Sequence, residues 1–294
     1  MNILSRIRYL LGHPLNKDNK LKAVLRILKW QVGTRLNPYP IIYQFTEHSK
    51  LVIKRGMTGA TGNVYCGLHE YHDMGFLLHL LRKDDCFADI GANIGSYTVL
   101  ASGQIGATTY SFEPVPATFA QLTDNISINQ VKEKVISYNV ALGSARGSIG
   151  FNIGAFDTMN HVAEKNEAAT IQVPVEILDD ILSTLKVPLL IKIDVEGFET
   201  EVIRGAMKTL RQQELKAIII ELNGSGARYG YDEKEIHTTL ASLHFLPYQY
   251  DPKERRLIVA DSSGGFNTIY IRDLDFVKQR LETAPAIKIL DSKL

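Results

Sequence analysis

The chain has 294 residues, of which 45% are hydrophobic and 22% charged, and its formal net charge is +1. This length and composition are typical of a soluble globular protein with an ample core, and they exclude a disordered or collagen-like chain. The two cysteines, Cys66 and Cys86, provide no disulfide framework, which favours a reducing, cytoplasmic environment. The N-terminus shows no signal peptide, and the uncharged run 90–112 is too polar for a membrane span.

The first 36 residues form a basic N-terminal arm with a net charge of +7, whereas the rest of the chain carries −6. Within the arm, apolar residues recur at helical spacing, at Leu21, Val24, Leu25, Leu28 and Val32. We expect this stripe to dock on the acidic catalytic domain of the same chain or of a partner. The alternatives are self-association and peripheral contact with an anionic membrane. A nucleic-acid partner is not expected, because the arm carries no recognisable reading motif.

Beyond the arm, the sequence predicts a strand at 51–54, a flexible glycine-rich loop at 56–63 and a helix at 71–82. Strands and helices then alternate. The expected strands span 86–90, 108–113, 135–142, 189–194 and 216–222, and the helices span 95–104, 116–129, 199–213 and 233–243. A hairpin is predicted at 147–153 and 170–175, an antiparallel pair at 247–251 and 256–260, and a last strand at 267–271. This order predicts a mainly parallel α/β sheet covered by helices on both faces. Three segments are expected: a helical extension with its linker (1–50), one domain (51–280) and a tail (281–294).

The run from Cys86 to Leu100 indicates a strand, a glycine-bent turn and the start of a helix, a geometry that holds adenosine-containing cofactors. Glu113 follows 22 residues after Gly91, at the end of the next strand, where a carboxylate can accept hydrogen bonds from ribose hydroxyl groups. A dinucleotide turn needs a second glycine where this chain has Asn93, and Asp89 would repel a pyrophosphate. The turn therefore fits S-adenosylmethionine, which has no phosphate, better than NAD.

Lys192 and Asp194 lie two residues apart in an apolar strand, so their side chains share one face. A buried lysine is costly unless it is paired. We therefore expect an ion pair at the carboxyl end of this strand. Because the lysine favours the carboxylate form of Asp194, this residue suits an orienting role better than that of a proton acceptor.

Four motifs together resemble the FkbM-type S-adenosylmethionine-dependent methyltransferases; they are F-A-D-I-G-A-N-I-G at 87–95, F-E-P at 112–114, I-K-I-D-V-E-G-F-E at 191–199 and I-E-L at 220–222. The resemblance covers about residues 85–225. It implies a Rossmann-like class I fold with seven strands, and methyl transfer to oxygen, often of a sugar or natural-product hydroxyl. It also implies a cofactor site; its residues would be Asp89, Gly91, Asn93, Gly95, Glu113, Pro114, Asn139, Val140, Ala141 and Asp194.

For catalysis we expect His161 to act as the general base, oriented by Asp157 in the same polar insertion, near Asp194 and Lys192. A second polar set is expected to contact a small-molecule or glycan acceptor; it comprises His69, Glu70, His72, Glu196, Asn223, Arg228 and Tyr229. No metal is assigned, because the histidine spacing does not match a zinc motif, although magnesium at Asp194 is left open.

Two other readings stay open at this stage. One is a nicotinamide-dependent oxidoreductase, against which Asn93 argues. The other is a non-catalytic, membrane-associated protein on a degenerate methyltransferase fold, against which the retained glycines and acids argue.

Overall fold

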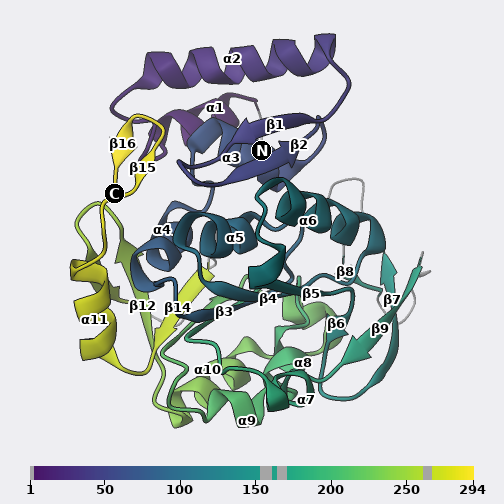
Figure 1. Ribbon diagram of the computed structural model, residues 1–294. Coiled ribbons are helices and arrows are strands. Elements are labelled where there is room, and N and C mark those ends of the chain that lie inside the picture. Colours follow the sequence, from purple (N-terminus) through teal and green to yellow (C-terminus); the bar gives the residue numbers. More distant parts are fainter. Residues whose placement is uncertain (1–2, 153–160, 164–170, 261–266) are drawn as a thin grey trace.

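A computed structural model describes the chain except for residues 1–2, 153–160, 164–170 and 261–266. Its centre is an eight-stranded sheet in the order β13-β12-β14-β11-β10-β3-β4-β5 (Figure 1). The strands are β3 (Cys86–Ile90), β4 (Thr108–Phe112), β5 (Val135–Tyr138), β10 (Leu190–Ile193), β11 (Ala217–Glu221), β12 (Leu246–Asp251), β13 (Arg256–Val259) and β14 (Asn267–Ile271). The five strands from β11 to β5 are parallel, and β14, β12 and β13 add antiparallel pairings. The predicted Rossmann-like α/β sheet is confirmed, with β13 as one strand more than the expected seven.

Helices cover both faces of this sheet (Figure 1). One face carries α4 (Tyr71–Leu80), α5 (Ser96–Val99) with a π-helical continuation (Leu100–Ile105), and α6 (Pro116–Ile128). The other face carries α7 (Leu178–Ile181), α8 (Glu199–Arg204), α9 (Met207–Leu210) and α10 (Glu233–Ser242). Strand residues alternate between the two cores: Phe87 and Ile219 pack on the α4 side, and Ala88 and Ile218 pack on the α8 side. By the same alternation, Asp89, Lys192 and Glu221 belong to the α4 side.

A smaller sheet stands beside the carboxyl ends of the main strands, in the order β6-β9-β7-β8. Its strands are β6 (Ala141–Leu142), β7 (Gly147–Asn152), β8 (His161–Val162) and β9 (Ile171–Glu176). The antiparallel pairing of β7 with β9 confirms the predicted hairpin. The predicted strand 135–142 is wrong as one unit, because β5 and β6 belong to different sheets.

The N-terminal segment, residues 3–66, forms a layer above α4 and α6 (Figure 1). It contains α1 (Ile3–Gly12) and α2 (Lys20–Leu36), followed by β1 (Ile41–Gln44), β2 (Lys50–Ile53) and α3 (Thr58–Cys66). Strand β1 pairs with β2 across the proposed boundary at residue 50. The C-terminal segment adds α11 (Leu274–Glu282) and a hairpin of β15 (Lys288–Ile289) and β16 (Ser292–Lys293). Short 3-10 turns lie at Lys132–Lys134, Leu182–Thr184 and Ser225–Tyr229.

Two further expectations about elements are wrong. The segment 56–63 is largely helical, since α3 begins at Thr58, and Gly62 packs so closely that an added Cβ would lie 2.6 Å from the His69 ring. The helix expected at 199–213 is broken into α8 and α9. At the break Gly205 leaves no room for a side chain, since its Cβ would lie 2.1 Å from the Gly143 carbonyl oxygen. The Asp179 carboxylate accepts the N–H groups of Lys208 and Thr209 and so caps α9.

Candidate active site

The turn after β3 brings the ends of three parallel strands together. The N–H groups of Gly91 and Ala92 donate to the Phe112 carbonyl at the end of β4, at 3.0 and 2.9 Å. Gly91 has a φ of +77°, and a Cβ there would lie 1.8 Å from the backbone oxygen of Asp194, after β10. Only glycine combines this backbone conformation with so close an approach. Gly91 therefore sets the spacing between the turn and Asp194.

Glu113 lines a small cavity beside this turn. One carboxylate oxygen accepts the N–H of Asn93 and the other accepts the N–H of Val115, both at 2.9 Å. Burial raises the pKa of Glu113 to about 7, although the two N–H groups oppose that rise. The remaining cavity wall combines several predicted cofactor residues with apolar side chains; among them are Gly91, Asn93, Pro114, Val140, Ala141, Asp194, Glu196 and Phe198.

Three predicted cofactor residues lie behind this wall rather than on it. Asp89 is 1% exposed and accepts a 2.6 Å hydrogen bond from the Thr98 hydroxyl. Burial raises the pKa of Asp89 to about 6, against the opposing effect of Lys192. A Cβ on Gly95 would meet Leu122 at 2.4 Å, so Gly95 serves helix packing. Asn139 donates to the carbonyls of Glu113 and Pro114, and it thereby fixes the loop that carries the cavity wall.

The expected pairing of Lys192 with Asp194 is confirmed, with 2.7 Å between the ammonium nitrogen and a carboxylate oxygen. Lys192 is 3% exposed, and its nitrogen also lies 4.8 Å from the centre of the Tyr97 ring. Burial by itself would lower the pKa of Lys192. The carboxylates of Asp194, Glu70 and Asp89 outweigh burial and raise that pKa above its ordinary value. Lys192 is thus a fixed positive charge beneath a group of acids.

Asp194, Glu196 and Glu221 form an acidic edge at the ends of β10 and β11, with carboxylate oxygens within 4.8 Å of one another. The parallel register pairs Ile193 with Ile220, which places Asp194 beside Glu221. Burial, together with the Asp194 and Glu196 charges, raises the pKa of Glu221 to about 8. Burial likewise raises the pKa of Glu196 to about 7. Three such oxygen donors suit a hard divalent cation, but Lys192 already neutralises Asp194.

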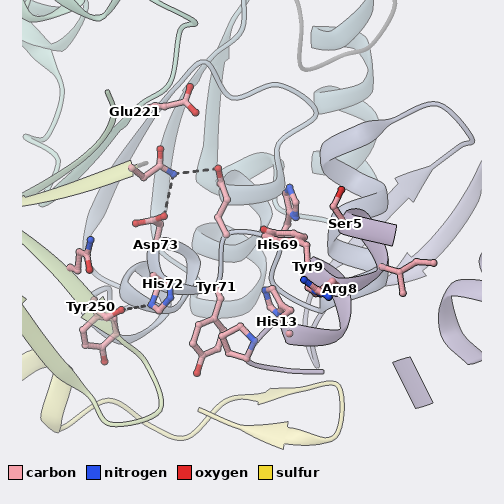
Figure 2. Close-up of a pocket in the computed structure, with 16 residues that line it drawn as sticks. Ser5, Arg8, Tyr9, His13, His69, Tyr71, His72, Asp73, Glu221 and Tyr250 are labelled. Carbon is pink, nitrogen blue, oxygen red and sulfur yellow. Dashed lines mark hydrogen bonds between the residues drawn. The ribbon is translucent and has the colours of Figure 1, made fainter. Parts of the chain in front are cut away.

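A second, larger cavity of about 1200 Å³ has Glu221 on its wall (Figure 2). Its wall is built by α1, the start of α4, and strands β12 and β14 of the main sheet; polar and aromatic lining residues include Arg8, Tyr9, His13, His69, Glu70, Tyr71, His72, Asp73, Gln249, Tyr250 and Asn267. The Asn267 amide donates to Glu70 at 3.3 Å and to Asp73 at 3.2 Å. Burial raises the pKa of Asp73 to about 7.

The structure divides the predicted acceptor residues between two places. His69, Glu70 and His72 line the large cavity. Glu196 lies on the wall of the small cavity, and Arg228 and His161 are close enough to oppose the rise in its pKa.

The remaining predicted residues lie around the small sheet and the turn after β11. Tyr229 donates to the Val162 carbonyl at 2.7 Å, and its ring centre lies 5.9 Å from the exposed Arg228 guanidinium. Asn223 caps the following turn by accepting the Ser225 N–H. Asp157 lies outside the described residues.

Sequence reasoning missed Glu221 and the contribution of α1. Glu221 had a signal, because an acid at the end of β11 must lie beside Asp194 once the two strands pair in parallel. The sequence carries no local signal for the role of Arg8, Tyr9 and His13, because only the tertiary fold brings the arm to the cavity.

The chain is similar in sequence to known proteins of one family. Residues 89–247 match the methyltransferase FkbM domain. The chain is 29% identical over 167 residues to the hexuronic acid methyltransferase AglP of Haloferax volcanii, covering 56% of this chain and 65% of that protein. It is 31% identical over 147 residues to Methyltransferase 1 of Beauveria bassiana, covering 42% of this chain and 59% of that protein. The chain thus spans less than two thirds of either relative.

A solved FkbM methyltransferase from Methylobacillus flagellatus is also similar, with 16% identity and a TM-score of 0.47 over 72% of this chain and 52% of that one. The domain match covers more than half of the chain and includes the turn, the acidic edge and β11. The chain belongs to the FkbM methyltransferase family.

Proposed function

We propose that the protein is an S-adenosylmethionine-dependent O-methyltransferase that methylates a hydroxyl group of a sugar or glycosylated acceptor. The observation that carries this proposal is the meeting of two cavities at one acidic edge: Asp194 and Glu196 line the small cavity, and Glu221 lines the large one. A donor and an acceptor bound in the two cavities would meet at these carboxylates. Aligning two reactants in this way supplies much of the catalysis of a direct transfer.

The small cavity suits the methyl donor. Each oxygen of Glu113 accepts one backbone N–H and has a lone pair left for a ribose hydroxyl. Val140 and Phe198 offer apolar surface for an adenine ring. The carboxylate oxygens of Asp194 and Glu196 can accept hydrogen bonds from the amino group of the donor.

The large cavity suits a carbohydrate acceptor. Its wall combines carboxylates, an amide and histidines, which hydrogen-bond hydroxyl groups, with the rings of Tyr71 and Tyr250. One curated relative is named as a hexuronic acid methyltransferase, which supports a sugar as the acceptor class. Arg8 at the arm end of the cavity offers a positive charge to a carboxylate on such a sugar.

We assign the proton-accepting role to Glu221. The acceptor oxygen forms a bond to the methyl carbon, the carbon–sulfur bond breaks with its electron pair passing to sulfur, and S-adenosylhomocysteine is left as a neutral thioether. The hydroxyl proton passes to the Glu221 carboxylate and then to water. Burial raises the pKa of Glu221, which makes its carboxylate a better proton acceptor, whereas the Asp194 carboxylate already accepts a 2.7 Å hydrogen bond from the Lys192 ammonium. His161, on β8 beside Glu196, is the alternative proton acceptor.

Glu221→Gln, compared with His161→Ala, tests this assignment by methyl transfer to a panel of candidate glycans. We expect Glu221→Gln to lower kcat about 10²–10⁴-fold and to remove the rise of kcat with pH, while S-adenosylhomocysteine affinity changes little. We expect His161→Ala to retain most of its turnover. A large loss of kcat in His161→Ala with little loss in Glu221→Gln would instead assign the proton-accepting role to His161. Separately, activity that a chelator leaves unchanged would show that the acidic edge works without a metal.

A further inference from the structure

The outer face of α2 carries an uninterrupted apolar stripe that nothing in the described chain covers. The residues of this α2 stripe and their exposed fractions are Leu21 (74%), Leu25 (57%), Leu28 (53%), Val32 (55%) and Leu36 (80%). They recur every three or four residues and therefore lie along one side of the helix. Single exposed leucines are ordinary, but a contiguous apolar patch marks a contact surface. Of the stripe expected from the sequence, Leu21, Leu25, Leu28 and Val32 are exposed and Val24 is half-buried, so the expectation that it docks on the chain's own domain is wrong. Docking on a partner's domain stays a prediction.

The inner face of α2 is held in place by different residues. Ala23, Trp30 and Thr34 are buried against the rest of the protein. The Arg26 guanidinium donates to Asn16 and to the Tyr65 carbonyl, both at 2.6 Å. With these contacts formed, the helix cannot turn its stripe inward. Figure 1 shows α2 as the outermost layer of the molecule.

The charge of α2 indicates which kind of surface covers the α2 stripe. The helix contains five basic residues and no acidic one. At 100° per residue, Lys22 and Lys29 border one side of the stripe, and Arg35 borders the other. Lys22 also pairs with Asp291 at 3.1 Å, and both side chains remain at least half exposed. Two copies packed through the stripe would bring these like charges together, whereas an anionic lipid surface would neutralise them.

We propose that α2 binds the protein to the surface of an anionic phospholipid membrane, with the α2 stripe inserted at the level of the acyl chains and the flanking lysines and arginine among the headgroups. A helix that presents an apolar face flanked by basic residues lies in the interface in this way. Spanning is not involved, since no helix within the described residues is both long and apolar enough to cross a bilayer. This contact is independent of the proposed methyl transfer.

Co-sedimentation of the full chain with vesicles tests the proposal, using phosphatidylcholine alone and phosphatidylcholine mixed with phosphatidylglycerol. We expect partition to the anionic vesicles to exceed that to neutral ones by at least about tenfold. Leu25→Glu with Leu28→Glu should lower it by at least about tenfold. The matched control is Val259→Glu, at a position on β13 that is 78% exposed, and it should bind like the unmodified chain.

The same samples are checked for folding by circular dichroism and for mass by light scattering. Equal binding to both kinds of vesicle, or no binding to either, would overturn the proposal. So would a two-chain mass that the double leucine variant abolishes, because a second copy would then cover the stripe.

Discussion

Gly91→Ala offers a sharp test of the way the turn positions the site. The added methyl group would lie 1.8 Å from the Asp194 carbonyl oxygen, and backbone atoms cannot move aside as a rotamer can. The positive φ costs about 1–2 kcal/mol for a residue with a Cβ, and forcing a methyl group into a packed site costs about 1–3 kcal/mol more. We therefore expect Gly91→Ala to lower the free energy of unfolding by about 2–5 kcal/mol.

Gly224→Ala is the matched control for this prediction. Gly224 has a similar φ of +83°, but a Cβ there would meet no atom within 4 Å. Gly224→Ala should therefore lower the free energy of unfolding only by the cost of the positive φ, about 1–2 kcal/mol. The two variants are compared by urea unfolding, and S-adenosylhomocysteine affinity should fall in Gly91→Ala alone. Equal destabilisation of the two would show that the close approach to Asp194 does not constrain the turn.

Two further predictions concern charge in the two cavities. Burial raises the pKa of Glu113 from 4.5 to about 7, so the unfolded chain loses this proton at lower pH than the folded chain does. Stability should fall as pH rises across that window, and Glu113→Gln should flatten the fall in thermal unfolding; an unchanged slope would contradict the assignment. Arg8→Ala should raise the acceptor KM and leave kcat and S-adenosylhomocysteine affinity nearly unchanged, because Arg8 lines the arm side of the large cavity. An equal loss of kcat in steady-state kinetics would argue against a pure binding role.

The parts of the site that sequence predicts well are those fixed by local pattern. Period-two alternation in β10 is enough to place Lys192 and Asp194 on one face, and the structure shows their ion pair. The glycine turn and Glu113 follow from the succession of strand, turn and helix. These features need no knowledge of distant contacts.

The parts that sequence does not predict depend on tertiary packing. The helix α3 forms in a glycine-rich segment whose Ala60, Val64 and Cys66 are buried, and tertiary packing of this kind can override weak helix propensity. The apolar stripe of α2 is visible in the sequence, but its exposure to solvent is not, since periodicity does not say which face of a helix docks on the protein. The large cavity joins α1 to β12 and β14, segments more than two hundred residues apart.

The cavity between Gly91, Glu113 and Asp194 is the proposed binding site of the methyl donor. Calorimetric titration of the full chain with S-adenosylhomocysteine and, separately, with NAD distinguishes this donor from a dinucleotide. We expect one S-adenosylhomocysteine site whose affinity falls at least about tenfold in Glu113→Ala, and no binding of NAD. Binding of NAD, or S-adenosylhomocysteine binding that Glu113→Ala leaves unchanged, would contradict the account.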